Sequence, residues 1–390
     1  MLSGIAVRLA RRMGLHRNGI SLGLSPFESE LRTRLWWQIV HIDLRASEIS
    51  GAVASKDLFL GDVKFPLNIE DEDLYPDMTE LPSERIGITP MVLCLLRCDL
   101  SELHDGLESN DRGWLRYDRL INTDMSIEEK DNLISKMEDL LERKYLRYCD
   151  PSNSLHCFVS VIARSSICKM KLLAHNPRQF SSRGIKVPQK DRDIIFTSGT
   201  KFLEYGNLLQ STPGLRKYMW QIRSGFIWDS LVYVLIETRH RKVGPEVDGV
   251  WKLINGVFSN YPNIFAEASD ALETAIGTWT LQVWDGCVAA RNAQGLSEQP
   301  TPDYIRSLRQ GRRPNTAVES SIKPNGQKED GNIAGNSISY AKDQSFGQVG
   351  YPVNDFGLQE AYDYSNLLSF DLDPNEWLQW ERLFGSQGNF

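Results

Sequence analysis

The chain has 390 residues, of which 41% are hydrophobic and 24% are charged, as in an ordinary globular protein. Its formal net charge of −7 argues against a protein that binds nucleic acid over its whole surface. No apolar run reaches the roughly 18 residues that a membrane-spanning helix needs, so no membrane partner is predicted.

The first predicted helix covers residues 1–15. Leu2, Ile5 and Leu9 recur at helical spacing, and arginines share the opposite face. Because no acidic residue precedes Glu28, this segment is also compatible with a mitochondrial transit peptide or with a basic arm that contacts DNA. Composition alone leaves these alternatives open.

A second helix is predicted from residue 26 to about Gly51. Ser25 and Glu28 have the spacing of a capping box, and Pro26 occupies the first helical position. The apolar stripe expected to face the core consists of Leu31, Leu35, Ile39 and Ile42, joined by Trp36 and Val40.

An irregular acidic loop is predicted from Phe65 to Asp77. Its contiguous acids, Glu70 to Asp73, follow a proline and would point to several sides of a loop. This favours a solvated loop or a helix N-terminus over a site for Mg²⁺ and diphosphate, which needs acids about one turn apart on a helix.

Almost every later segment has the periodicity of a helix. Predicted helices cover residues 90–103, 126–150, 155–175, 191–210, 220–237, 251–258 and 268–291. Ser126 and Glu129 form a second predicted capping box. Because alternation of period two is nearly absent, we predict an all-α fold. After Asn292, Gly, Ser, Asn, Gln and Pro dominate and predict disorder, although the region contains an arginine cluster that includes Arg306 and Arg309.

The chain contains none of the motifs G-x-x-x-x-G-K-[ST], G-x-G-x-x-G and H-E-x-x-H. The six histidines lack metal-ligand spacing, and Cys94 and Cys98 lie one helical turn apart without a second pair that would complete a zinc set. The six cysteines are interpreted as small core residues in a reducing compartment. We therefore predict no enzymatic activity, no catalytic residue, no cofactor and no metal ligand in this chain.

The last 40 residues, 351–390, are rich in acids and aromatics and contribute −6 to the net charge. Like charges keep apolar side chains in solvent, so such a segment can fold as an amphipathic helix on the apolar groove of a partner. The candidate partner-binding residues are Phe370, Trp377, Trp380, Leu383 and Phe384. The alternative is a C-terminal helix that docks on its own domain.

Two N-terminal stretches, "AVRLARRMGLHRNG" and "SPFESELRTRLWWQIVHIDLRAS", together with "FPLNIEDEDL", resemble the middle homology region of fungal zinc-cluster transcription factors. Later blocks are also similar, so the resemblance covers residues 1–291 and the last twenty. The positions that match the motifs are Gly14, Leu15, His16, Arg17, Glu30, Arg32, Arg34, Trp36, Trp37, Asp43, Pro66, Asn68, Asp71 and Asp73.

The resemblance implies an all-α, multi-helix regulatory domain at residues 1–291, a disordered linker at 292–350 and a candidate activation segment at 351–390. It also implies that residues 1–15 form a packed helix. Arg32, Arg34 and Asp43 are expected to form ion pairs and helix contacts rather than to act in catalysis. The family's DNA reader, a cluster of six cysteines that binds zinc, has no counterpart here. We therefore expect an N-terminally incomplete domain, with zinc only if such a cluster lies upstream.

The expected function is regulation of transcription in the nucleus, directed at a metabolic or biosynthetic gene set. Expected partners are the transcription machinery or co-activators, reached through the tail. A homodimer or a heterodimer with a DNA-binding factor is a further possibility, since direct DNA binding by this chain is not expected. The alternative is a repurposed all-α scaffold or small-molecule-binding protein, conceivably a biosynthetic enzyme, derived from the same domain.

Overall fold

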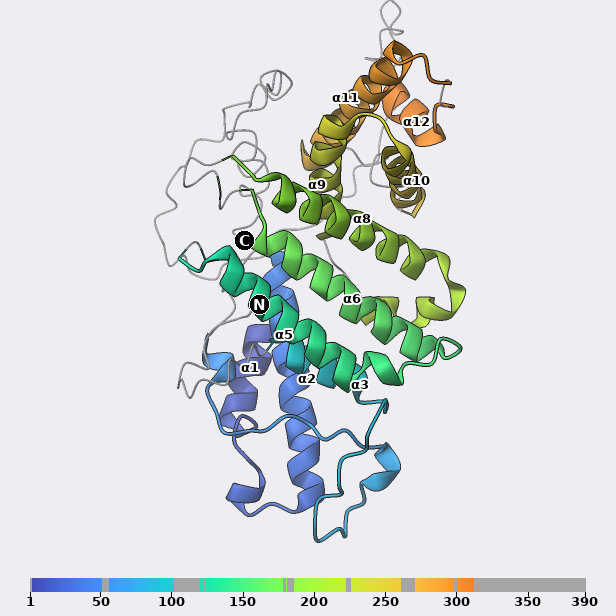
Figure 1. Ribbon diagram of the computed structural model, residues 1–390. Helices are drawn as coiled ribbons and strands as arrows, with labels where there is room; N and C mark the ends of the chain where they lie inside the picture. Colours follow the sequence, from blue (N-terminus) through green and yellow to red (C-terminus); the bar gives the residue numbers. More distant parts are fainter. Residues whose placement is uncertain are drawn as a thin grey trace, which may run out of the picture. The chain divides into compact units, whose positions relative to one another are not determined.

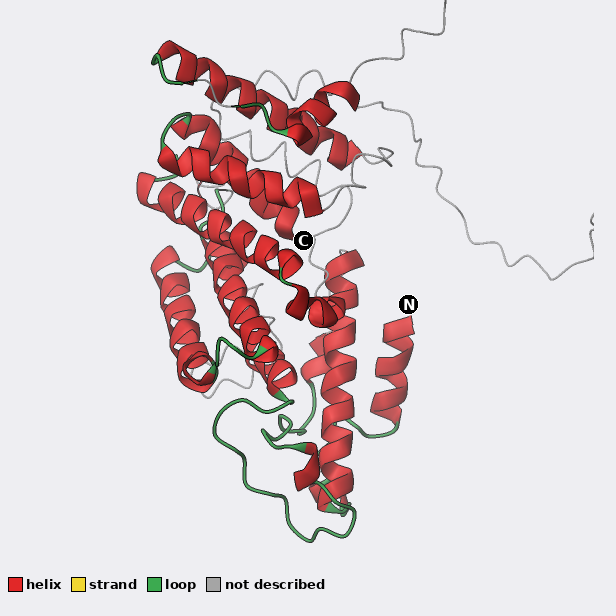
Figure 2. Cartoon of the chain, turned by 90° about the vertical axis from the view of Figure 1, so that its right-hand side faces the viewer, coloured by secondary structure: helices red, strands yellow, loops and turns green. Residues whose placement is uncertain are grey.

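The computed structural model describes residues 2–50, 56–101, 120–122, 124–177, 180, 186–221, 226–260, 271–297 and 300–311. Within these ranges the regular secondary structure is helical and contains no strand (Figure 2). The predicted all-α fold is therefore confirmed. None of the helices in the described ranges combines the length and apolar character needed to cross a membrane.

The N-terminal helix α1 (Leu2–Arg12) packs against α2 (Pro26–Ser50), as Figure 1 shows. The face that touches α2 carries Val7 and Ala10, whereas Leu2, on the apolar stripe recognised in the sequence, is 84% exposed. The expected packed helix is present, and it contacts α2 through a different face from the one that carries Leu2. Small side chains allow the two helix axes to approach closely.

Helix α2 begins and ends where its sequence signals predict. The hydroxyl of Ser25 accepts a hydrogen bond from the Glu28 backbone amide at 3.2 Å, and the helix ends at Ser50. Half of the predicted stripe faces the core, because Trp36 and Val40 are buried and Ile39 packs against them. The other half, Leu31, Leu35 and Ile42, is exposed, and Trp37 is buried in addition. The two indoles remove more apolar surface from water than the leucines do, and they occupy the core.

The middle of the chain forms a second core. Its helices are α3 (Val92–Ser101), α5 (Ile127–Lys144) and α6 (Ser154–Ala174), with a short 3₁₀ turn at Leu146–Tyr148. Two further 3₁₀ turns, Lys56–Phe59 and Asp71–Asp73, lie in the segment between α2 and α3. Leu96, Ile134 and Met170 are among the side chains that they bury together. Ser126 and Glu129 form the predicted capping box, with hydrogen bonds in both directions.

Helix α8 (Gln189–Ser211) packs on α6 and also contacts α9 (Phe226–Arg241) and α10 (Pro245–Asn260), while α11 (Ala271–Ala293) packs on α9 (Figure 1). The prediction of a helix from residue 220 is wrong. Trp220 instead lies, exposed, in a 3₁₀ segment, Pro213–Gln221, that precedes α9.

The folded region extends beyond the predicted boundary at residue 291. Helix α12 (Asp303–Gly311) packs against α10 and α11 and buries Tyr304, Ile305 and Leu308. Tyr304 stacks on Phe258, with ring centroids 4.8 Å apart. The sequence analysis missed this helix because its few apolar residues lie in a stretch dominated by polar residues and proline. The predicted linker beyond residue 311, and the tail with Phe370, Trp377, Trp380, Leu383 and Phe384, lie outside the described residues.

The packing of α12 predicts a specific loss of stability. Ile305 is 0% exposed, so Ile305→Ala should lower the free energy of unfolding by about 2–5 kcal/mol. The control is Leu296→Ala, because Leu296 lies exposed between α11 and α12 and its loss should change stability by less than about 0.5 kcal/mol. Urea unfolding of the full chain, followed by circular dichroism, measures both. Equal effects of the two substitutions would show that α12 is not part of the core.

Candidate functional site

The end of α1 explains the Gly14–Leu15 pair. Gly14 has a φ of +71°, a left-handed conformation that costs glycine little. Its amide bonds to the Arg11 carbonyl at 3.0 Å, and the Leu15 amide bonds to the Ala10 carbonyl at 2.9 Å. This is a Schellman motif, in which the residue after the glycine packs back on the helix. Leu15 is accordingly buried, so the pair terminates α1 and anchors the next loop.

Two arginines of the motif fasten this loop. Arg32 of α2 donates to the Met13 carbonyl at 2.6 Å, which places a cation at the negative C-terminal end of α1. Arg17 pairs with Asp62 at 2.9 Å, and the same Asp62 oxygen accepts the Asn18 amide at 2.9 Å. These hydrogen bonds, led by that of the Asn18 amide, lower the pKa of Asp62.

His16 is held in a close-packed corner. Its ring lies 5.9 Å from that of Trp36, centroid to centroid, and burial lowers the pKa of its imidazole, with Arg11 adding to the effect. A Cβ atom on Gly61 would lie 2.2 Å from the His16 carbonyl oxygen. Only glycine therefore fits at position 61 without a backbone shift, and His16 acts as a packing residue.

The charged residues at the start of α2 form an ion-pair network around one buried carboxylate, that of Glu30. Glu30 is 4% exposed and accepts hydrogen bonds from Arg34 and from the Leu67 amide, both at 3.1 Å. Arg34 also binds Asp71 at 2.8 Å. Burial raises the pKa of Glu30, and the hydrogen bond from Arg34 opposes that effect. The network fastens the acidic loop to α2.

The acidic loop is further organised by Asn68. Its amide nitrogen donates to the carbonyls of Arg85 and Gly87 at 2.6 and 3.0 Å, and its oxygen accepts from the Thr89 hydroxyl at 2.7 Å. Arg85 makes two hydrogen bonds of 2.7 Å to Asp73, and they lower the pKa of that carboxyl group.

The acidic run itself is a 3₁₀ turn in which Asp71 and Asp73 bind different arginines. These two acids therefore point apart, as expected for a loop, and do not converge on one cation. Pro66 is buried beside the loop. Asp43 is half-buried on α2 and has no ion pair with any residue that the structure describes.

One face of α2 carries Glu30, Arg34, Trp37 and His41, at spacings of four, three and four residues. The indole nitrogen of Trp37 donates to the Lys64 carbonyl at 2.8 Å. His41, at the far end of this face, reaches α3, where its Nε2 atom lies 3.5 Å from the sulfur of Cys98.

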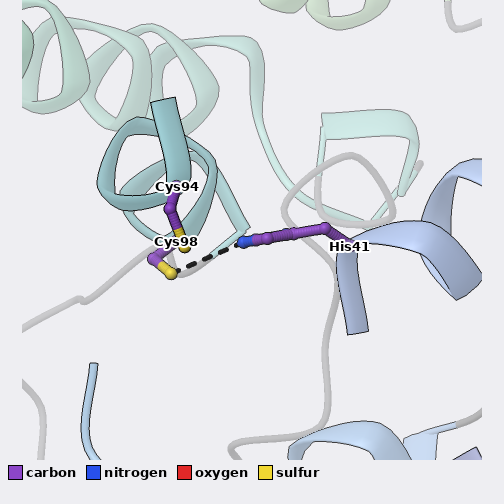
Figure 3. A group of neighbouring side chains, drawn as sticks. All are labelled: His41, Cys94 and Cys98. Atoms are coloured by element: carbon purple, nitrogen blue, oxygen red, sulfur yellow. Dashed lines mark hydrogen bonds between the residues drawn. The ribbon is translucent and has the colours of Figure 1, made fainter. Parts of the chain in front are cut away.

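His41, Cys94 and Cys98 form the group of side chains that the sequence analysis did not bring together (Figure 3). Their ligand atoms all lie within 4.8 Å of one another. The hydrogen bond with Cys98 lowers the pKa of the Cys94 thiol to about 5, burial opposes this effect and His41 adds to it. Two features of the sequence could have indicated this group: the two cysteines four residues apart on one helix, and the face of α2 that ends in His41.

A groove of about 1110 Å³ lies along α5, α6 and α8. Four basic and five acidic side chains line it, so its charge favours no single class of ligand. At its edge the buried His175 lies 2.6 Å from Asp191 and 2.9 Å from Asp131, and it thereby joins all three helices.

The buried network predicts a large and pH-dependent effect of Arg34→Met. Removing the guanidinium leaves Glu30 buried without its counter-charge, which should cost about 3–5 kcal/mol of stability at neutral pH. The pKa of Glu30 should rise further in the variant, so the penalty appears as the pH rises through that pKa and fades in acid, where Glu30 is protonated.

Urea unfolding of wild type and variant at neutral and mildly acidic pH measures both effects. Arg17→Met is the matched control, because the Arg17–Asp62 pair is exposed and should contribute only about 0–1 kcal/mol. A similar small loss for Arg34→Met at neutral pH would contradict the importance of the network.

Comparison with known proteins gives these residues a family context. Residues 1–165 match the family described as fungal specific transcription factor domain. The aurofusarin cluster transcription factor of Gibberella zeae is 28% identical over 407 residues, which cover 100% of this chain and 58% of that protein. The transcriptional regulator AacuB of Aspergillus aculeatus is 28% identical over 272 residues, covering 69% of this chain and 36% of that protein.

A third relative, the pyriculol/pyriculariol biosynthesis cluster transcription factor 1 of Pyricularia oryzae, is 25% identical over 316 residues, covering 79% of this chain and 42% of that protein. The chain thus spans between 36% and 58% of the length of these relatives. No solved structure matches the chain. The motif residues described above lie within the matched region, so residues 1–165 carry the features of the fungal specific transcription factor domain, and the whole chain is similar to a cluster transcription factor.

Proposed function

We propose that this protein regulates transcription of a biosynthetic gene cluster in the nucleus of a fungus. The observation that carries the proposal is the alignment of the entire chain with a protein named as a cluster transcription factor. Two further relatives are named as a biosynthesis cluster transcription factor and a transcriptional regulator. The names of these relatives refer to their own gene clusters, so the genes that this chain controls have to be identified by experiment.

The geometry of the motif supports a regulatory rather than an enzymatic role. Glu30, Arg34 and Asp71 bind one another, and Arg32 and Arg17 bind a helix end and a loop carboxylate. Each of these groups has a structural partner, whereas a catalytic acid, base or nucleophile must reach a substrate. The helical domain then serves as a scaffold, and DNA contact comes from a dimer partner or from a zinc cluster upstream.

A small-molecule-binding role is the alternative, and the groove along α5, α6 and α8 is where such a ligand would bind. The mixed charge of the groove selects no ligand class, so we retain transcription regulation as the proposal.

Deletion of the gene followed by transcript sequencing tests the proposed function. We expect coordinated change in a contiguous set of biosynthetic genes and restoration by the wild-type allele. An unchanged transcript profile under conditions in which the protein is expressed would refute the proposal.

The tail is proposed to contact co-activators through its aromatic face. Residues 351–390 fused to an unrelated DNA-binding domain should activate a reporter gene, and the double substitution Trp377→Ala and Trp380→Ala should abolish that activation, because it removes two anchors from one helical face. The matched control is Tyr362→Ala with Tyr364→Ala, which removes two aromatic rings upstream of that face and should preserve activation. The activation role would be refuted if the wild-type fusion is inactive, or if the wild-type, double-tryptophan and double-tyrosine fusions are equally active.

A further inference from the structure

The three side chains of His41, Cys94 and Cys98 come from two helices that are far apart in sequence. Cys94 and Cys98 are one turn apart on α3, and both sulfur atoms lie on the side of α3 that His41 approaches from α2 (Figure 3). Both cysteines are free thiols, and the ligand atoms of all three residues lie within 4.8 Å of one another. The group is therefore compact enough to share one bound ion.

The spacing within the group fits a metal coordination sphere. Zn²⁺ binds thiolate sulfur at about 2.3 Å and imidazole nitrogen at about 2.0–2.1 Å in tetrahedral geometry. Those bond lengths place the two ligand atoms about 3.5 Å apart. The observed distance between His41 Nε2 and Cys98 Sγ is 3.5 Å, so these two ligands require little movement to bind an ion.

The surroundings of the group also favour an ion. Cys98 is 0% exposed and His41 is 7% exposed, and Cys98 packs in the apolar cluster of Trp36, Trp37 and Val40. A buried imidazole needs a strong partner, and a thiol is a weak one. Two thiolates and one imidazole would neutralise a divalent cation in this core, and soft sulfur ligands select thiophilic ions over Mg²⁺ or Ca²⁺.

A disulfide between the two cysteines is the competing chemistry, and helix geometry disfavours it. Residues four apart on a helix have Cβ atoms about 5–6 Å apart. A disulfide needs Cβ atoms about 3.5–4.5 Å apart. Because α3 is helical through both positions, oxidation would require the helix to distort.

We propose that His41, Cys94 and Cys98 bind one thiophilic d¹⁰ metal ion, Zn²⁺ or Cu⁺, and that the ion links α2 to α3. For Zn²⁺ the three protein ligands leave a fourth position for water or another small ligand, whereas Cu⁺ is satisfied by three. This site is distinct from the six-cysteine cluster of the family's DNA reader, because its ligands lie within the helical domain.

Metal titration of the full chain tests the site. The protein is purified without oxygen, stripped by a chelator and titrated with Zn²⁺ in one arm and Cu⁺ in the other, each against a chromogenic competitor. We expect one ion per chain in at least one arm, and Cys98→Ser or His41→Gln should weaken its binding more than about tenfold. Cys157→Ser is the matched control, because Cys157 is a half-buried thiol on α6 outside the group, and it should leave binding unchanged.

A second measurement on the wild-type chain does not depend on whether the variants fold. The bound ion should protect the partly buried Cys94 from alkylation, as mapped by mass spectrometry, while Cys149 and Cys157 react equally with and without it. The proposal is overturned if neither ion binds, if Cys94 reacts at the same rate with the ion present, if binding survives both substitutions, or if the unreduced chain contains a Cys94–Cys98 disulfide.

Discussion

The burial of one carboxylate, that of Glu30, is the constraint on which the N-terminal half of this structure depends. A charged group in a protein core is stable only when its hydrogen-bonding capacity and its charge are both met. Arg34 meets the charge from one turn further along α2, and the Leu67 amide supplies a hydrogen bond from the acidic loop. Since Arg34 also reaches Asp71, the loop is fastened to α2 at two points, and its course across the helix is set.

The same helix face extends the constraint to α3. Further along α2 than the ion pair, Trp37 donates a hydrogen bond to the Lys64 carbonyl and packs edge-on against Phe65. One turn later, His41 lies beside the two cysteines of α3. Helix α2 therefore presents ionic, aromatic and thiol contacts in succession along one line. In this arrangement Glu30 and Arg34 bind each other and the acidic loop, so the search for function turns to the groove, to the group of His41, Cys94 and Cys98, and to the chain beyond residue 311.

Local signals in the sequence predicted the helices well, but they could not select the buried face. The capping pairs at Ser25 and Ser126 act through atoms within three residues, and both are present in the structure. On α1 and α2, apolar side chains occur on more than one face, and only the partner decides which face is buried. Leu2 and Leu35 are exposed because Val7 and Trp36 face the neighbouring elements instead. Helix α12 escaped prediction because its three buried side chains lie in a polar, proline-containing stretch.

The sequence by itself determined the helical class, the ends of several helices and the resemblance to fungal transcription factors, because periodicity, caps and motifs are properties of neighbouring residues. It also predicted ion pairs and helix contacts for Arg32, Arg34 and Asp43, of which the structure shows polar partners for the two arginines. Only the tertiary structure decided which partners they have and that His41 lies beside Cys94 and Cys98. His41 and Cys98 are 57 residues apart, and the packing of α2 on α3 sets their distance. No spacing rule within one segment encodes such a contact, since it depends on the loop between the helices and on the side chains that fill the core.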